Sequence, residues 1–469
     1  MNDHPRVRLR NRTFAELRVG DSAELTRQLT EADIALFAAV SGDVNPAHTD
    51  ADYASNGRFG RVIGHGMWTA SLISAVLGTR LPGPGTVYLR QDLRFLAPVS
   101  LGDTVTARVT VATLEAQRPH ARLDCVCFKA DGTRVLEGEA EVLVPTESIE
   151  LDAVEMPDVL LQRHDRFDAL LERARGLPPV RVAVVHPCSA AAMEAVEQAQ
   201  AAGLIVPILI GPRARIEAAA AQSGTALDGI ELIDTPHSHA SAAEGVKLAA
   251  QHRVDVLMKG SLHTDELLEA VVAREGGLRT GRRISHVYAM DVPAYDRLLM
   301  VTDAAVNVAP DLAAKRDIAQ NAIDLARVLG IDEPRVAVLS AVETVNPKMA
   351  STLDAAALAV MARRGQITGG IVDGPLAFDN AIDRQAAITK GLDSPVAGQA
   401  DILLVPDIEA GNMVAKQLLY FAGADGAGLV LGAKVPVILT SRSDSVRVRV
   451  ASVALASLLA RAPRLKAPA

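Results

Sequence analysis

A short segment near the amino terminus combines the residue types that acid–base chemistry requires. Residues 41–48 read Ser-Gly-Asp-Val-Asn-Pro-Ala-His, so that Asp43 and His48 stand five residues apart. Gly42 permits a tight turn, and Pro46 takes the chain out of the helical stretch that precedes it. A carboxylate and an imidazole on one constrained loop can orient a water molecule and remove a proton from it. We therefore interpret Asp43 and His48 as a candidate catalytic pair.

A second candidate feature is the tripeptide His65-Gly66-Met67, which opens an apolar stretch over residues 67–81. This stretch is expected to form a helix, and the first turn of a helix offers backbone N–H groups and the positive end of the helix dipole. Gly66 lets a carbonyl oxygen approach closely, which is the geometry that stabilises the oxyanion of a thioester enolate. His65 precedes the helix and is either catalytic or a residue that holds the loop in place, and we favour the second role.

In the second half of the chain, small and polar residues follow several apolar, strand-like runs. Backbone N–H groups of small residues can reach a bound anion, and lysine and hydroxyl side chains add further donors. No P-loop, zinc-protease or serine-hydrolase motif accompanies them, and we interpret His237 and His239 as surface residues, not metal ligands. The candidate binding residues in these loops are Lys259, Ser261, Asn346, Lys348, Ser394 and Asn412.

The elements that position these residues change in character near residue 146. Before it, short alternating runs broken by turn signals predict antiparallel strands around one buried helix, an α+β arrangement. Residues 147–178 are charged and helical in period, which predicts a linker with one amphipathic helix or a helix that packs on the following domain. From residue 179, strand and helix patterns alternate many times, which predicts parallel α/β structure in two lobes around a cleft.

The predicted boundaries follow from these changes. The first domain spans residues 13–146, the linker 147–178 and the second domain 179–469. Within the second domain, lobe I is expected over about 179–305 plus 438–469, and lobe II over about 306–437.

Composition excludes several classes of function. The chain has 469 residues and a formal net charge of -8, with 56 acidic residues against 48 lysines and arginines. An acidic chain with 3% aromatic residues is not expected to bind nucleic acid through backbone charge or base stacking. Three cysteines cannot build a disulfide framework, and no apolar run reaches the roughly 18 residues of a membrane span. We expect a cytoplasmic protein with no membrane contact, no metal and no tightly bound cofactor.

Over about residues 13–145, the motifs SGDVNPAHTD and GHGMWTASLISAVLG resemble the MaoC-like, R-specific enoyl-CoA hydratases. The resemblance implies an α+β hot-dog fold in which Asp43 and His48 activate the water that adds to the β-carbon of a trans-2-enoyl-CoA. It further implies that Asn45 shapes the loop and that Gly66 supplies the oxyanion N–H. Because hot-dog domains pair with their active sites near the interface, a homodimer or a higher homo-oligomer is expected.

Over about residues 178–465, the motifs MKGSLHTDELL, SAVETVNPKM and VLGAKVPVILTSRSDS resemble the phosphate acetyltransferases and phosphate butyryltransferases. The resemblance implies a two-lobed α/β domain that exchanges an acyl group between coenzyme A and phosphate. In the acetyltransferases a Ser-Arg pair near the C-terminus serves the reaction, and here it is Ser441 and Arg442. A carboxylate that acts on the CoA thiol stands seven residues after that serine, whereas this chain has Val448. The base is therefore a group on the opposing lobe, or the thiol ionises in a positively charged site.

Both resemblances imply acyl-CoA chemistry, and the sequence therefore predicts a bifunctional enzyme. One domain would hydrate trans-2-enoyl-CoA reversibly to (R)-3-hydroxyacyl-CoA, and the other would interconvert acyl-CoA plus phosphate with acyl phosphate plus CoA. Coenzyme A thioesters and phosphate are the expected substrates. The alternative is an active hydratase whose C-terminal domain only binds acyl-CoA in a regulatory or assembly role.

Overall fold

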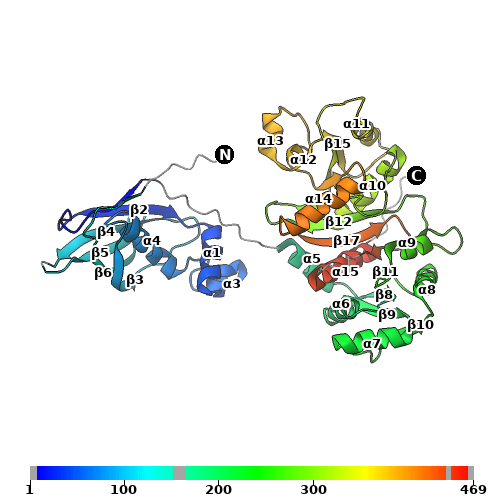
Figure 1. The fold of residues 1–469 in the computed structure, drawn as a ribbon, viewed down its shortest axis with the longest axis horizontal. Coiled ribbons are helices and arrows are strands. Elements are labelled where there is room, and N and C mark those ends of the chain that lie inside the picture. Colours follow the sequence, from blue (N-terminus) through cyan, green and yellow to red (C-terminus); the bar gives the residue numbers. More distant parts are fainter. Residues whose placement is uncertain (1–7, 116, 152–164, 440–444, 463–469) are drawn as a thin grey trace. The chain divides into compact units, whose positions relative to one another are not determined.

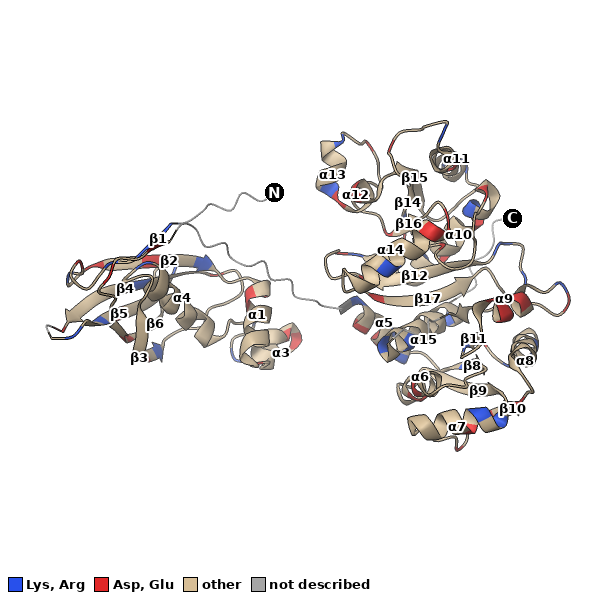
Figure 2. Ribbon diagram, viewed as in Figure 1, with Lys and Arg blue, Asp and Glu red and all other residues tan. Residues whose placement is uncertain are grey.

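The computed structural model describes residues 8–115, 117–151, 165–439 and 445–462. The chain divides into two compact units, Met1–Leu161 and Gln162–Ala469 (Figure 1). Acidic and basic residues are interspersed along the elements of each unit (Figure 2). Within the described ranges, no helix combines the length and the apolarity that a membrane span requires.

The first unit is an antiparallel sheet with one buried helix. Its five long strands take the order β2-β4-β5-β6-β3, and α4 packs on β2 and β4 (Figure 1). Along β4 alternate residues such as Val105, Ala107 and Val109 are fully buried, as the period of a half-buried strand requires. The elements are β1 (Leu9–Arg10), β2 (Ser22–Gln28), α1 (Glu31–Ser41), α2 (Pro46–Thr49), α3 (Ala51–Ser55), α4 (Gly66–Thr79), β3 (Val87–Phe95), β4 (Thr104–Leu114), β5 (His120–Lys129), β6 (Arg134–Leu143) and β7 (Glu150–Leu151).

The second unit contains one continuous sheet of eleven strands in the order β10-β9-β8-β11-β18-β17-β12-β13-β16-β14-β15. The strands are β8 (Val180–Val185), β9 (Ile205–Gly211), β10 (Glu231–Asp234), β11 (Val256–Lys259), β12 (Ser285–Asp291), β13 (Leu298–Thr302), β14 (Arg335–Leu339), β15 (Ile371–Leu376), β16 (Ile402–Leu404), β17 (Asp425–Leu431) and β18 (Val437–Ile438). The helices are α5 (Asp165–Arg175), α6 (Ala190–Ala201), α7 (Arg213–Ser223), α8 (Ser238–Ala250), α9 (Thr264–Val272), α10 (Leu312–Val328), α11 (Ala350–Arg363), α12 (Phe378–Ile382), α13 (Arg384–Thr389), α14 (Ile408–Tyr420) and α15 (Val446–Arg461).

The direction of the strands reverses in the middle of this sheet. Strands β10, β9, β8, β11 and β18 are parallel to one another, and so are β13, β16, β14 and β15. Between these groups, β17 is antiparallel to β18 and to β12, and β12 is antiparallel to β13. The two parallel groups therefore run in opposite directions along one sheet.

The sheet runs continuously across the expected lobe boundary at residues 305 and 306, so the two lobes stay a prediction. Strands β12 and β13 precede this boundary along the chain, and they pair with β17 and β16, which follow it. Alternating strand and helix patterns locate the strands along the chain, whereas the pairing is set by long-range backbone contacts that the pattern does not encode.

Helix α5 belongs to the second unit, although the sequence left its place open. Phe167 is completely buried in the core of that unit. Asp291, the last residue of β12, accepts hydrogen bonds from the backbone N–H groups of Arg166 and Phe167 and from the guanidinium of Arg166, at 2.9, 3.2 and 2.8 Å. A carboxylate thus satisfies the first turn of α5 and opposes its dipole. Residues 152–164 of the expected linker lie outside the described residues.

The substitution Asp291→Ala is expected to lower the free energy of unfolding by about 3–5 kcal/mol, because it leaves buried donors without an acceptor. Urea denaturation of the full chain measures this loss. Glu231→Ala is the control, because it removes a pair with Arg253 in which both side chains are 48% exposed, and such pairs contribute about 1 kcal/mol or less. Equal losses from the two substitutions would contradict this anchoring role.

Candidate functional sites

The loop between α1 and α2 is fixed by short-range hydrogen bonds. Gly42 ends α1 with a left-handed backbone, φ 74°, and its N–H donates to the carbonyl of Ala38. The Asp43 carboxylate accepts from the N–H of Asn45 at 3.2 Å, and the Asn45 side chain caps α2 by accepting from Ala47 at 3.1 Å. Asp43 itself is exposed in this unit. The sequence Gly-Asp-x-Asn-Pro therefore builds a rigid turn that presents a carboxylate to solvent.

His48, in α2, has a defined tautomer. Its Nδ1 lies 2.8 Å from the carbonyl oxygen of Ile63. Because a carbonyl oxygen only accepts, Nδ1 must carry the proton and Nε2 keeps its lone pair. A half-buried imidazole in this tautomer can remove a proton from a water molecule.

His65 connects the start of α4 to the Asp43 loop. It is 2% exposed, and its Nε2 donates to the backbone carbonyl of Asp43 at 2.9 Å. Its ring centroid lies 4.1 Å from that of His48 and 5.0 Å from that of Phe37. The hydrogen bond from His65 to the Asp43 carbonyl is the contact expected of a residue that holds the loop in place.

Asp43, His48 and His65 also have the spacing of a metal site, since one ligand atom from each lies within 4.8 Å of the others. Two histidines and one carboxylate form a donor set that transition metals accept. Nε2 of His65 is engaged as a donor to the Asp43 carbonyl, whereas its buried Nδ1 has no hydrogen-bond partner among the described residues. The hydrogen bond of Nε2 supports the interpretation of His65 as a residue that holds the loop.

The first turn of α4 faces the same region. Gly66 is its first residue, and the His65 side chain makes no cap hydrogen bond to this turn. The N–H of Trp68 in this turn donates to the carbonyl of His65 at 3.0 Å, whereas the N–H groups of Gly66 and Met67 precede the first intrahelical bonds and can bind an oxyanion. A Cβ atom at position 66 would lie 3.0 Å from the ring of Phe95, which indicates that only glycine fits here without displacement.

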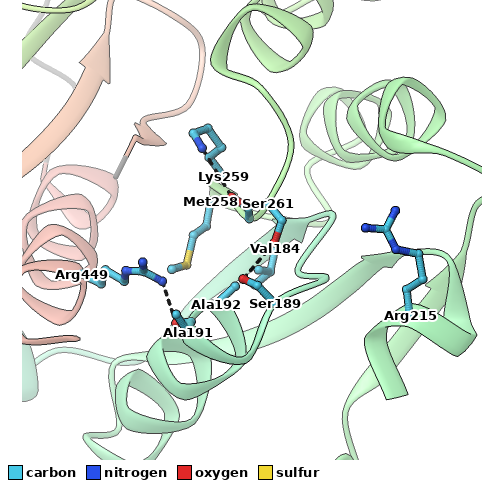
Figure 3. Close-up of a pocket in the computed structure, with 10 residues that line it drawn as sticks. Val184, Ser189, Ala191, Ala192, Arg215, Met258, Lys259, Ser261 and Arg449 are labelled. Carbon is cyan, nitrogen blue, oxygen red and sulfur yellow. Dashed lines mark hydrogen bonds between the residues drawn. The ribbon is translucent and has the colours of Figure 1, made fainter. Parts of the chain in front are cut away.

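The second site is a cavity of about 410 Å³ at the carboxyl ends of β8 and β11 (Figure 3). The residues that line it come from β8, α6 and the turn before it, α7, β11 with the following loop, and α15. They are Val184, Ser189, Ala191, Ala192, Arg215, Met258, Lys259, Gly260, Ser261 and Arg449. Among the described residues, the lining contains three cations and no carboxylate, which favours an anionic ligand.

The polar groups of the cavity are held by hydrogen bonds. Ser261 donates its hydroxyl to that of Ser189 at 3.0 Å. Lys259 is 7% exposed and its Nζ donates to the carbonyl of Leu262 at 3.2 Å. Arg449 is 6% exposed and donates to the carbonyl of Ala191 at 2.6 Å. Two nearly buried cations and a hydroxyl pair thus border one cavity.

Of the binding residues expected from sequence, Lys259 and Ser261 line this cavity. Asn346 and Lys348 are exposed on the loop after β14. Asn412 lies in α14, and its amide is 3.4 Å from the carbonyl of Ala304. These three and Ser394 are not among the residues that line the cavity.

Ser394 was expected after a strand, but it lies between α13 and β16. Its hydroxyl accepts from the N–H groups of Val396 and Ala397, both at 3.2 Å. Ser394 therefore stabilises a local turn, which is a common role of a serine that precedes a proline. Ser441 and Arg442 lie outside the described residues.

Sequence reasoning missed Ser189, Arg215 and Arg449. Ser189 follows β8, so the rule that ligands bind at the carboxyl ends of parallel strands would have found it. Arg215 and Arg449 lie on α7 and α15, each far along the chain from Lys259, and no local motif distinguishes them from other arginines.

Each of the two units is similar to a known protein family. The family model for phosphate acetyl/butyryl transferases matches residues 237–457, and the model for MaoC-like domains matches residues 18–122. The chain is 57% identical over 295 residues to the phosphate acetyltransferase of Rhizobium meliloti, which covers 63% of this chain and 93% of that protein.

Two solved structures are similar to separate parts of the chain. A branched-chain phosphotransacylase from Enterococcus faecalis V583 is 31% identical with a TM-score of 0.54, over 60% of this chain and 99% of that chain. An unliganded R-hydratase from Pseudomonas aeruginosa is 42% identical with a TM-score of 0.32, over 33% of this chain and 100% of that chain.

The fold and the comparisons together define a multidomain α/β protein preceded by an α+β hot-dog unit. The chain belongs to the phosphate acetyl/butyryl transferase family, and it carries a MaoC-like domain at its N-terminal end.

Proposed function

We propose that the C-terminal unit transfers an acyl group between coenzyme A and phosphate. The observation that carries this proposal is the cationic cavity bordered by Lys259, Arg215 and Arg449 in a member of this family. Phosphate and acyl phosphate are anions. Lys259 and Arg449 are nearly buried, and such cations bind anions more strongly than exposed ones because the surrounding dielectric is lower.

In the direction of acyl phosphate synthesis, a phosphate oxygen attacks the thioester carbonyl and the carbon–sulfur bond then breaks. The acyl carbon keeps its oxidation state, and the CoA thiolate leaves and takes up a proton. Lys259 and the Ser189–Ser261 hydroxyl pair would donate to phosphate oxygens or to the tetrahedral oxyanion, and their position on the cavity supports this. We propose that Arg442 clamps phosphate and that Ser441 binds the oxyanion.

We propose that, in the reverse direction, no separate residue has to act as the base that deprotonates the CoA thiol. Position 448 is a valine at the start of α15, and no carboxylate of the described residues lines the cavity. Neighbouring cations favour the thiolate form of a thiol and so lower its pKa. The cavity therefore stabilises the thiolate by charge.

We propose that the N-terminal unit hydrates trans-2-enoyl-CoA. His48 would take a proton from water through its free Nε2, the hydroxide would add to the β-carbon, and the α-carbon would take up a proton. Asp43 would orient the water, and the N–H of Gly66 would bind the enolate oxyanion. The fixed tautomer of His48 and the MaoC-like match support this assignment.

We also propose that the hot-dog unit pairs with a second copy through β3. This strand is at the edge of the sheet, and Val87, Leu89 and Phe95 on it are each about half exposed, at 51%, 49% and 51%. An apolar edge strand invites pairing with another strand. The Phe95 ring lies 3.0 Å from where a Cβ atom at position 66 would be, which would bring the interface close to the proposed oxyanion site.

The transferase proposal predicts that the full chain releases CoA thiol from acetyl-, propionyl- or butyryl-CoA only when phosphate is present. Lys259→Met should lower kcat/KM for phosphate by roughly 10–100-fold, the effect of losing one hydrogen bond to a charged group. Lys247→Met is the control, because Lys247 is exposed and pairs with Glu244. An absence of thiol release in a preparation that hydrates enoyl-CoA normally would favour the alternative, a domain that only binds acyl-CoA.

The hydratase proposal predicts that Asp43→Asn and His48→Ala each lower the rate of enoyl-CoA hydration by roughly 10²–10⁴-fold. The loss of enoyl absorbance measures the rate, and phosphate-dependent thiol release should stay unchanged. His120→Ala is the control, since His120 lies in β5 beside Glu115. Loss of both activities from either change would contradict two independent sites.

The pairing proposal predicts that Leu89→Glu lowers the sedimentation mass of the full chain and the hydratase rate together. A charge on an apolar edge opposes strand pairing. Val19→Glu is the matched control, because Val19 is 65% exposed and precedes β2 at the opposite edge of the sheet. An unchanged mass for Leu89→Glu would exclude β3 as the interface.

A further inference from the structure

His186 has an unusual backbone conformation directly after β8, beside the cavity of the C-terminal unit. Its φ is 57°, in the left-handed region, and its side chain is 5% exposed. Residues other than glycine adopt this conformation rarely, and it concentrates at functional positions.

The backbone of His186 is locked by the chain that follows β11. The N–H of Ser261 donates to the carbonyl of His186 at 2.8 Å, and the N–H of Gly260 donates to that of Val185 at 2.8 Å. A Cβ atom at position 260 would lie 2.5 Å from the carbonyl oxygen of His186. The two loops therefore meet backbone to backbone, and Ser261 in the cavity is placed by the same contact.

The side chain of His186 is held in one tautomer. Its Nδ1 lies 3.2 Å from the hydroxyl of Ser241, which itself donates to the carbonyl of His237 at 3.0 Å. The Ser241 proton is thus engaged elsewhere, so Nδ1 of His186 is the donor and Nε2 keeps a lone pair. Thr235 completes the chain through its hydroxyl, 2.8 Å from that of Ser241.

The free Nε2 of His186 accepts from the guanidinium of Arg215 at 3.4 Å. Arg215 lines the cavity, and Figure 3 shows it across from Arg449. Within the described ranges, Arg215 has no carboxylate partner at ion-pair distance. The neutral imidazole of His186 therefore orients the Arg215 guanidinium without neutralising its charge, so that this charge can attract a bound anion.

We propose that His186 is a positioning residue that holds Arg215 toward the cavity and so sets the affinity of the C-terminal unit for a phosphoryl group. This inference rests on the proposed acyl transfer and extends it to a residue that does not touch the substrate. The phosphoryl group is either that of phosphate or one of those of coenzyme A.

The charges around His186 keep it in the form that this role needs. Burial and then the Arg215 guanidinium lower its pKa, and His237 acts in the same direction, whereas Glu266 opposes them. A protonated imidazole would present an N–H to the Arg215 guanidinium and lose the hydrogen bond. At neutral pH the residue therefore remains an acceptor.

The test is a double-mutant cycle in the full chain with His186→Asn and Arg215→Ala. Asparagine tolerates a positive φ but is too short to reach Arg215 as histidine does. Arg215→Ala should raise the KM for one phosphoryl substrate roughly ten-fold, and His186→Asn should raise the same KM by a smaller factor with kcat nearly unchanged. In the Arg215→Ala background, the effect of His186→Asn should disappear.

The KM values for phosphate and for coenzyme A are measured separately, and the one that changes identifies the phosphoryl group. His252→Asn is the matched control, because His252 also has a φ of 57° but is exposed and lies outside the cavity. Additive effects of the two substitutions, or no effect of Arg215→Ala on either KM, would overturn the inference. Calorimetric titration with phosphate and with coenzyme A repeats the cycle without turnover. If the wild-type chain shows no transfer activity, the transferase proposal is rejected, and the calorimetric affinities still test the positioning role of His186.

Discussion

The antiparallel ribbon β17–β12–β13 is the constraint on which the C-terminal unit depends. All seven residues of β12 are buried, and the strand pairs over its whole length with β17. The ribbon joins two parallel groups of opposite direction. Because neighbouring strands twist by about 20–25°, the six steps from β11 to β14 add roughly 120–150°, so a sheet of this width can present the carboxyl ends of both groups to one side. Helices α5 and α15 pack on the ribbon and fix its position.

Sequence patterns predicted the hot-dog unit well because its information is local. The strands alternate with a period of two, and the candidate residues Asp43, His48 and Gly66 lie within one short stretch of the chain. Turn residues such as Gly42 and Asn45 shape the loop through hydrogen bonds to residues at most four positions away, and His65 adds a bond to the Asp43 carbonyl. The structure adds the tautomer of His48, which depends on a carbonyl fifteen residues away.

The C-terminal unit was predictable as an α/β fold but not as an arrangement of strands. Apolar runs located the strands, yet the place of β12 beside β17 depends on pairing across more than a hundred residues. The same limit applies to its cavity. Lys259 ends β11 and Ser261 follows it, so the strand pattern could mark both as candidates. Arg215 and Arg449 reach the cavity from helices whose position depends on the tertiary fold.

The left-handed backbone at His186 has a consequence for how this site can evolve. A substitution there must satisfy two requirements at once, a positive φ and an acceptor that reaches Arg215. Asparagine and glycine meet the first requirement and fail the second, whereas glutamine fails the first. Few single substitutions of His186 would therefore keep the site working, and we expect this position to tolerate little sequence change. Change in anion preference would have to arise at Arg215 or at residues beside it, where the backbone is helical and tolerant.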